Sequence, residues 1–301
     1  MAPSATAATT TVPSLASSPS ESGTAAGLPQ LIVLADGVQG GVGLWTYGND
    51  GSWTAGASLP GATAIARDGR RLTLAAQGSL ELRDIARPQD VAPQVGVTWP
   101  SQMPKGTISC VDRSDAGKTV VAMTDADGIT FALVSADGIG GPLLPVPESP
   151  FGPSVAWLDA DRVLVVSGDT RQIPRLTVLD TTNRSVTFLR GLTGVRGFAV
   201  SPDRLSLAAA TESAVYVGSV SDLLADREPA AIATLGPSQV VWDLTLDGDG
   251  SRLAMLSGTE AADGTVADTH EVGYERREGS WAKIFDSPVP FTRASGQVWL
   301  I

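Results

Sequence analysis

The stretch VRGFAVSPDRLSLAAA, residues 195–210, decides the fold. Two apolar runs flank the four residues Ser201-Pro202-Asp203-Arg204. Proline presets the backbone for a turn, and aspartate hydrogen-bonds the chain two residues on, so this composition is typical of a tight turn. The stretch therefore predicts a β-hairpin, and degenerate copies of the same unit recur along the chain.

Five such turns join pairs of apolar runs, and each turn contains an aspartate: Asp68, Asp115, Asp161, Asp203 and Asp249. The spacings between these aspartates are 47, 46, 42 and 46 residues. No window between them shows a strong amphipathic helix, and only 221–227 is long enough for one or two helical turns. A period in the forties built from strands alone is typical of β-propeller blades.

Each unit continues with a third and a fourth predicted strand. The third strands are 80–84, 129–135, 176–180, 214–219 and 270–276, and the fourth are 94–99, 141–146, 185–190, 230–235 and 281–286. The first two strands of a unit are the most apolar, as expected where inner strands pack between blades and the outermost strand meets water.

Two pieces remain outside the five units. The runs 31–36, 41–47 and 52–58 match the second, third and fourth strands of a blade, and 298–301 is one further apolar run. Together they predict a sixth blade, in which the C-terminal strand joins the N-terminal blade and closes the ring. We therefore expect an all-β, six-bladed β-propeller over 30–301. A seven-bladed ring truncated at its C-terminus is the alternative.

Residues 1–29 are almost entirely Ala, Ser, Thr, Pro and Gly. Such a stretch buries too little apolar surface to offset its ordering entropy, so we expect disorder. Its composition fits a surface tether behind an export signal or lipid anchor, which favours an extracellular or cell-envelope location. A non-native start and a cytoplasmic location are the alternatives. The sequence shows no apolar run long enough to span a membrane and no intact signal peptide.

The net charge and the scarcity of cysteine and histidine argue against several classes of partner and site. The formal net charge is −11, which argues against a nucleic-acid partner, because phosphate binding needs clusters of Lys and Arg. Cys110 is the single cysteine and His270 the single histidine of the sequence, so a disulfide is impossible and a catalytic triad or multi-histidine metal site is disfavoured. We expect Cys110 to act as a small buried hydrophobe, and we expect neither a metal nor a cofactor.

Two segments carry a family resemblance. AVSPDRLSLAAATESAVYVGS (199–219) and IARDGRRLTLAAQGSLELRD (65–84) resemble the repeats of WD40-like and lipoprotein-type β-propellers. The resemblance implies a rigid ring used for binding, in an envelope or secreted module. The chain lacks the Gly-His of a true WD40 repeat, and its Trp242-Asp243 pair falls on a predicted inner strand, where we interpret it as coincidence.

Three further features have structural explanations that we favour. The turn Asp247–Ser251 resembles half of a calcium loop, but neither register supplies the glycine and glutamate that such a loop requires, so we expect an acidic hairpin turn. Carboxylate pairs such as Asp159 and Asp161 fall in predicted turns. Most of the seven tryptophans occupy strand positions that predict packing between blades.

In a propeller, the connections from fourth to first strand and from second to third strand share one face, where ligands commonly bind. We expect a mixed surface of cations, one aromatic and an acidic rim to bind a protein or peptide there. Its candidate residues are Lys105, Phe151, Arg196 and Gln239 from the former connections, and Asp125, Asp127, Asp169, Arg171, Glu212 and the loop 258–269 from the latter. A non-enzymatic binding or scaffold role is the leading hypothesis, while a hydrolase or lyase acting on a carbohydrate or lactone, and a purely structural role, are the alternatives.

Overall fold

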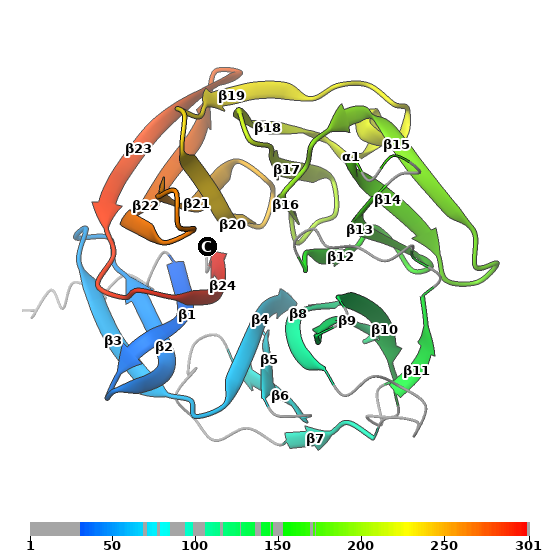
Figure 1. The fold of residues 1–301 in the computed structure, drawn as a ribbon, viewed down its shortest axis with the longest axis horizontal. Coiled ribbons are helices and arrows are strands. Elements are labelled where there is room, and N and C mark those ends of the chain that lie inside the picture. Colours follow the sequence, from blue (N-terminus) through cyan, green and yellow to red (C-terminus); the bar gives the residue numbers. More distant parts are fainter. Residues whose placement is uncertain are drawn as a thin grey trace, which may run out of the picture.

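The computed structural model describes residues 31–299 except 69–70, 77–78, 85–93, 99–105, 115–116, 127, 136–139, 145, 147–152, 169–170 and 172. The predicted tail, residues 1–29, lies outside the described residues. The described chain forms six four-stranded antiparallel sheets arranged as blades around a central axis (Figure 1).

The blades follow the chain order around the ring. Blade 1 contains β24 (Ala294–Trp299), β1 (Leu31–Val38), β2 (Gly41–Tyr47) and β3 (Trp53–Ser58). Blade 2 contains β4 (Ala62–Asp68), β5 (Arg71–Ala76), β6 (Ser79–Asp84) and β7 (Gln94–Gly96). Blade 3 contains β8 (Thr107–Arg113), β9 (Thr119–Thr124), β10 (Ile129–Val134) and β11 (Gly140–Leu143).

The other three blades complete the circle. Blade 4 contains β12 (Val155–Trp157), β13 (Arg162–Gly168), β14 (Pro174–Asp180) and β15 (Val186–Thr193). Blade 5 contains β16 (Gly197–Val200), β17 (Ser206–Ala210), β18 (Ala214–Ser219) and β19 (Ala230–Thr234). Blade 6 contains β20 (Gln239–Leu246), β21 (Arg252–Glu260), β22 (Val266–Arg277) and β23 (Ser280–Pro288). A short helix, α1 (Val220–Leu224), follows β18, and the side chain of Ser219 caps it by accepting from the Asp222 amide.

The six-bladed ring and its closure by the C-terminal strand are confirmed. β24 pairs with β1 in an antiparallel register that sets Leu31 opposite Trp299 and Val33 opposite Gln297. β24 lies beside β1, close to the centre of the ring, in Figure 1. The strand begins at Ala294, four residues before the predicted Val298, because the segment Ala-Ser-Gly-Gln pairs through its backbone although it has no bulky apolar run.

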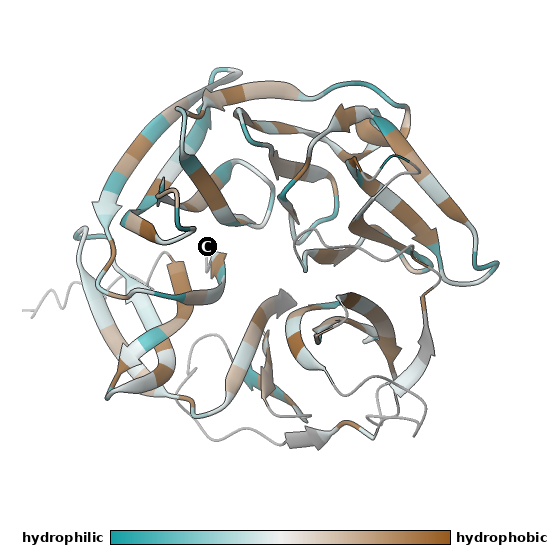
Figure 2. Ribbon diagram, in the orientation of Figure 1, coloured by the Kyte–Doolittle hydropathy of each residue, from teal (hydrophilic) through white to brown (hydrophobic). Residues whose placement is uncertain are grey.

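Burial within each blade falls outward, as the apolar gradient predicts. On β13, the second strand of blade 4, six of seven residues are buried, whereas on β3, the outermost strand of blade 1, none is. Figure 2 shows the same contrast, with hydrophobic positions concentrated on strands such as β20 and a largely pale β3. The buried clusters join neighbouring blades, and one unites Leu164 and Leu176 of blade 4 with Leu207 and Ala209 of blade 5. Packing between blades therefore stabilises the ring.

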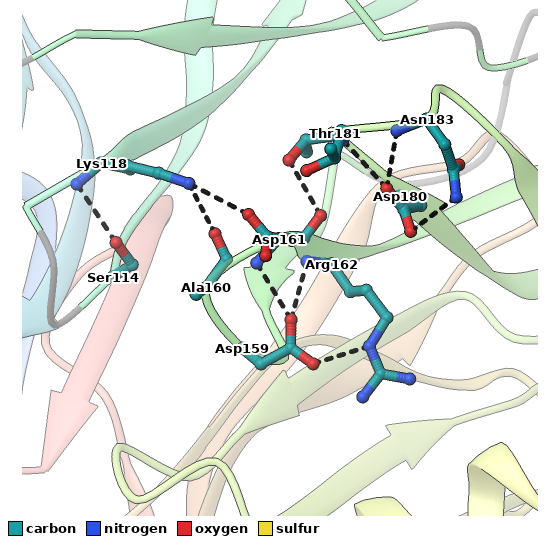
Figure 3. A network of polar contacts seen from close by, with 10 residues as sticks. Ser114, Lys118, Asp159, Ala160, Asp161, Arg162, Asp180, Thr181 and Asn183 are labelled. Atoms are coloured by element: carbon teal, nitrogen blue, oxygen red, sulfur yellow. Dashed lines mark hydrogen bonds and ion pairs between the residues drawn. The ribbon is translucent and has the colours of Figure 1, made fainter.

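The predicted turn chemistry accounts for the hairpins. Asp159 Oδ1 accepts from the amides of Asp161 and Arg162, at 3.0 and 2.8 Å. Lys118 of blade 3 reaches this turn of blade 4, where its Nζ donates to the Ala160 carbonyl at 2.8 Å (Figure 3). The same Nζ lies 3.3 Å from Asp161 Oδ1, so the Asp159 carboxylate stabilises its own turn and the Asp161 carboxylate helps to link the turns of two blades.

We call the face where the innermost strands begin the upper face, and the face where they end the lower face. Register shows that each innermost strand begins beside the end of its second strand, as Gly197 lies opposite Ala210 and Gln239 opposite Thr259. Connections into a blade and connections from second to third strand therefore share the upper face.

None of the helical segments in the described ranges has the length and hydropathy needed to cross a bilayer.

Candidate functional site

The six innermost strands enclose a central cavity of about 230 Å3. All six blades contribute to its wall, which includes Ala64, Ser109, Cys110, Asp112, Ser154, Ala199, Arg204, Trp242, Asp243, Ser295 and Gln297. Its polar side chains differ between the two ends, so each end is described separately.

An ion pair crosses the lower end of the channel. Arg204, in the turn after β16 of blade 5, donates to both carboxylate oxygens of Asp112 on β8 of blade 3, at 2.8 and 3.2 Å, and to the carbonyl of Arg113 at 2.9 Å. Asp112 also accepts from the amide of Trp157 on blade 4, at 2.7 Å. One buried side-chain pair therefore ties three blades together.

Burial and pairing with Arg204 shift the pKa of Asp112 in opposite directions. Desolvation is the largest influence and raises the pKa of this carboxyl above its usual value, while the Arg204 guanidinium opposes the rise. Arg204 reaches the channel from a left-handed backbone position with φ of 63°. That conformation is uncommon for an arginine, and the three hydrogen bonds made by its guanidinium stabilise it.

The upper end of the channel presents an exposed aromatic ring. Trp242 is 37% exposed and occupies a bulge of β20 between Val241 and Asp243. Gly258 lies beside it, and a Cβ at that glycine would lie 3.2 Å from Trp242 Cη2 and 2.9 Å from Val266 Cγ1. The absence of a side chain at Gly258 therefore makes room for Trp242 and the exposed Val266 to flank it.

Asp243, next to Trp242, is the half-buried carboxylate of the upper cavity. Its Oδ1 accepts from the Leu244 amide at 2.9 Å, while its buried Oδ2 has no partner within the described part of the chain. Desolvation raises the pKa of Asp243 to about 7, although the nearby backbone N–H groups of Leu244 and Gln297 oppose the shift. A carboxyl with such a pKa changes charge near neutral pH.

Cys110 faces the same cavity and is half-buried, a little more open than the sequence predicts. Its Sγ lies 4.0 Å from the carbonyl oxygen of Val155. Desolvation raises the pKa of the thiol to about 12, so it is protonated at neutral pH and is a poor nucleophile.

A second carboxyl lies behind the cavity, in the interface between blades 6 and 1. Glu271 on β22 is fully buried, and neither of its carboxylate oxygens has a hydrogen-bond partner among the described residues. Leu256 pairs with Asp243 on one side and Glu271 on the other, so the two carboxyls occupy one row of the sheet. Desolvation, reinforced by Asp243, raises the pKa of Glu271 well above 4.5.

We expect Glu271→Gln to stabilise the protein at pH 8 and to have little effect at pH 4. The unfolded chain ionises this carboxyl near 4.5, and the folded protein does so at higher pH. The buried charge therefore destabilises the fold as pH rises above 4.5, by about 1.4 kcal/mol for each unit of pKa difference, and glutamine removes that charge. Urea denaturation at both pH values measures the change. Glu228→Gln, at an exposed position, is the control, and an equal effect at pH 4 and pH 8 would contradict this account.

The structure places the predicted binding residues that it describes on the upper face. Arg171 and Asp125 follow second strands, and Gln239 begins β20. Arg196 and Glu212, at the upper end of blade 5, form an ion pair. Lys105, Phe151, Asp127 and Asp169 lie outside the described residues.

Two predicted residues are engaged in their own loops. Asp125 Oδ1 accepts from the Gly128 amide at 3.1 Å, and Gln239 Oε1 accepts from the Gly236 amide at 3.1 Å. Among the predicted residues, Arg196 and Glu212 are in direct contact.

Trp242 and Asp243 are not among the site residues predicted from the sequence. The pair is conspicuous as the Trp-Asp dipeptide of the chain, and the structure places it in the wall of the cavity. The signal that could have found it is a charged residue beside a bulky aromatic on an otherwise apolar inner strand.

The Asp247–Ser251 segment forms the acidic hairpin turn that was expected. Asp247 Oδ1 accepts from the Arg252 amide at 2.9 Å and Oδ2 accepts from Ser251 Oγ at 3.0 Å. Asp249 Oδ1 accepts from the Ser251 amide at 2.9 Å, and Gly250 adopts a positive φ of 71°. Both carboxylates thus stabilise the turn itself.

Comparison with known proteins identifies similar folds. No family model and no curated protein matches the sequence. Among solved structures, TolB from Acinetobacter baumannii superposes with a TM-score of 0.61 at 10% identity, over 90% of this chain and 66% of that chain. A chain of the nidogen–laminin complex superposes with a TM-score of 0.62 at 9% identity, over 90% of this chain and 98% of that one.

A protein provisionally named a 6-phosphogluconolactonase, from Bacteroides uniformis, also matches. Its TM-score is 0.51 at 13% identity, over 88% of this chain and 84% of that chain. At these identities the three likenesses establish one conclusion, which is that the chain has the fold of a β-propeller.

Proposed function

We propose that this chain is a binding propeller that recognises a protein or peptide through its upper face, with Trp242 as the central contact. The observation that carries the proposal is the exposure of this large ring at the mouth of the channel. Tryptophan is enriched among the residues that contribute most to protein–protein affinity. Val266, which flanks the same glycine, extends the apolar contact beyond the ring.

The charges around Trp242 favour a partner that carries basic groups. The β21–β22 hairpin beside the mouth presents exposed carboxylates at Glu260, Asp263 and Asp268. On blade 5, Arg196 is paired with Glu212, so this cation is already neutralised. Complementary charges at the rim of an interface accelerate association and select among partners.

Peptide selection tests this function. A random peptide library is displayed on phage and selected against the immobilised propeller, and the enriched peptides are then titrated by calorimetry. We expect Trp242→Ala to weaken their binding by about thirtyfold, since hot-spot truncation costs about 2 kcal/mol or more. Leu205→Ala is the matched control, because Leu205 is an exposed apolar residue of the lower-face turn after β16.

Two results would overturn the proposal. One is a selection in which no peptide is enriched over an uncoated surface. The other is a set of peptides whose affinity falls with Leu205→Ala and not with Trp242→Ala.

The Ala/Ser/Thr/Pro-rich composition of residues 1–29 supports an envelope or extracellular setting for this binding role. Fractionating cells that express the full-length native gene, with detection by antibody, tests the location. Recovery with the cytoplasmic fraction would contradict it.

A hydrolase or lyase is the second candidate, and Asp243 is the observation that favours it. A carboxyl with a pKa of about 7 in a cavity is suited to general acid–base catalysis. A screen of lactones and glycosides tests this alternative, which requires turnover that Asp243→Asn abolishes.

A further inference from the structure

The upper half of the channel carries a negative charge that its neighbours do not neutralise. Asp112 at the lower end is compensated by Arg204, through two hydrogen bonds. Asp243 at the upper end accepts a hydrogen bond from the Leu244 amide, and its Oδ2 has no partner among the described residues. At a pH where Asp243 is ionised, the cavity therefore attracts a cation.

We propose that this half of the channel binds a primary ammonium group, held between the carboxylate of Asp243 and the ring of Trp242. The inference rests on the proposed function in one respect, since the natural source of the group is a lysine side chain of the bound peptide. A free alkylamine offers the same chemistry, and the experiment below separates the two sources.

Three features of the wall suit this ligand. Trp242 and Asp243 are consecutive residues that line both the main cavity and a smaller recess beside Ser154. An ammonium over a tryptophan face gains a cation–π interaction, which strengthens where water is excluded. Gln297, which is nearly fully buried in the same wall, has a side-chain oxygen, Oε1, that no described group satisfies.

The hydrogen-bonding geometry favours ammonium over guanidinium. A guanidinium binds a carboxylate best through two parallel hydrogen bonds. Asp243 Oδ1 is already engaged by the Leu244 amide, so one oxygen remains for a ligand. Oδ2 is buried in the wall, and the broad final torsion of aspartate allows the carboxylate to turn toward a ligand in the cavity.

Binding of an ammonium group at this site should be coupled to proton release, so its affinity should depend on pH. The charged and titratable groups around Asp243 are Glu271 on the same blade, Cys110 and Asp112 on blade 3, and Arg204, which is held by Asp112. Because the pKa of Asp243 is about 7, bound ammonium displaces a proton near neutrality. We expect affinity to rise from pH 6 to pH 8 and the protein to release protons on binding.

The test is calorimetry with n-butylammonium chloride, and with n-butanol as the uncharged control. We expect the amine to bind and the alcohol not to bind. Asp243→Asn preserves the shape of the side chain and should weaken amine binding by about tenfold or more, as expected for loss of a charged hydrogen bond. Glu228→Gln removes an exposed carboxylate from the connection between β18 and β19, outside the upper face, and should leave binding unchanged.

The second arm uses the peptides selected against the upper face. If a lysine of the peptide supplies the ammonium, replacing that lysine by norleucine should weaken binding to the wild type and leave binding to Asp243→Asn unchanged. If the amine binds but the peptides do not depend on lysine, the site takes a free amine and the peptide source is wrong.

The ammonium site is overturned if n-butylammonium fails to bind at pH 8, or if Asp243→Asn and Glu228→Gln weaken its binding equally. These outcomes differ from failure of the proposed function, since peptides that depend on Trp242 can bind whether or not the channel accepts an amine. Melting curves of each variant confirm that it is folded.

Discussion

We expect deletion of residues 297–301 to unfold or aggregate the protein, whereas deletion of residues 2–28 should leave its melting temperature within about 2 °C, a shift that corresponds to about 1 kcal/mol or less. Both truncations remove terminal residues, so position in the sequence alone predicts similar tolerance. The difference arises because β24 is the innermost strand of blade 1 and closes the ring.

The C-terminal deletion removes packing and pairing together. Val298 and Trp299 are almost completely buried, and Trp299 packs with Leu31, Val33 and Leu256 in the interface between blades 6 and 1. Each large buried side chain contributes a few kcal/mol, and a domain is typically stable by only about 5–15 kcal/mol. Loss of the strand also exposes the edge of β1, which invites pairing with other molecules.

Thermal melting and light scattering of the two truncated proteins measure the effect. Trp299→Ala is a milder change than the C-terminal truncation and should lower the free energy of unfolding by about 3–5 kcal/mol. Trp281→Ala, on the outermost strand of blade 6, should cost much less because Trp281 is only partly buried. Two truncated proteins with the same melting temperature would show that closure contributes little to stability.

The repeat was predictable from the sequence because its signals are local. An aspartate in each turn bonds amides two or three residues away, as Asp159 and Asp247 do, and the turns recur at nearly constant spacing. The start of β24 was not predictable, since Ala294–Gln297 pair through their backbone and offer no apolar pattern. Its last residues were predictable because Val298 and Trp299 are apolar and buried.

The candidate site could not be predicted from local sequence patterns, because it is formed by residues that are far apart in the sequence. Arg204 and Asp112 are 92 residues apart, and nothing near either residue indicates the other. The exposure of Trp242 depends on a bulge in β20 and on Gly258 of the next strand. The upper-face position of Arg196 and Glu212 was predictable because strand order alone fixes which connections share a face.

Arg204→Met is expected to destabilise the fold by about 3–5 kcal/mol, the usual cost of leaving one member of a buried ion pair uncompensated. The substitution leaves the Asp112 carboxylate buried and removes the link from blade 5 to blades 3 and 4. Arg184→Met is the matched control, since Arg184 also has a left-handed backbone, with φ of 59°, but is exposed. Urea denaturation at pH 7 measures both.

Two further measurements separate the contribution of the Arg204 charge to stability from that of the packing of its side chain. Adding Asp112→Asn to Arg204→Met removes the uncompensated charge while the asparagine oxygen can still accept from the Trp157 amide, so the double variant should recover much of the loss. Without Arg204, the folded pKa of Asp112 rises further above its unfolded value of 3.8, because the guanidinium lowers it in the wild type. The deficit of Arg204→Met should therefore be largest at neutral pH and shrink as pH falls toward 4, where Asp112 becomes neutral. The opposite result is a loss of stability that persists at pH 4 and is not recovered in the double variant. It would mean that Arg204 acts through packing of its aliphatic stem, and that charge pairing across the channel is not what joins the three blades.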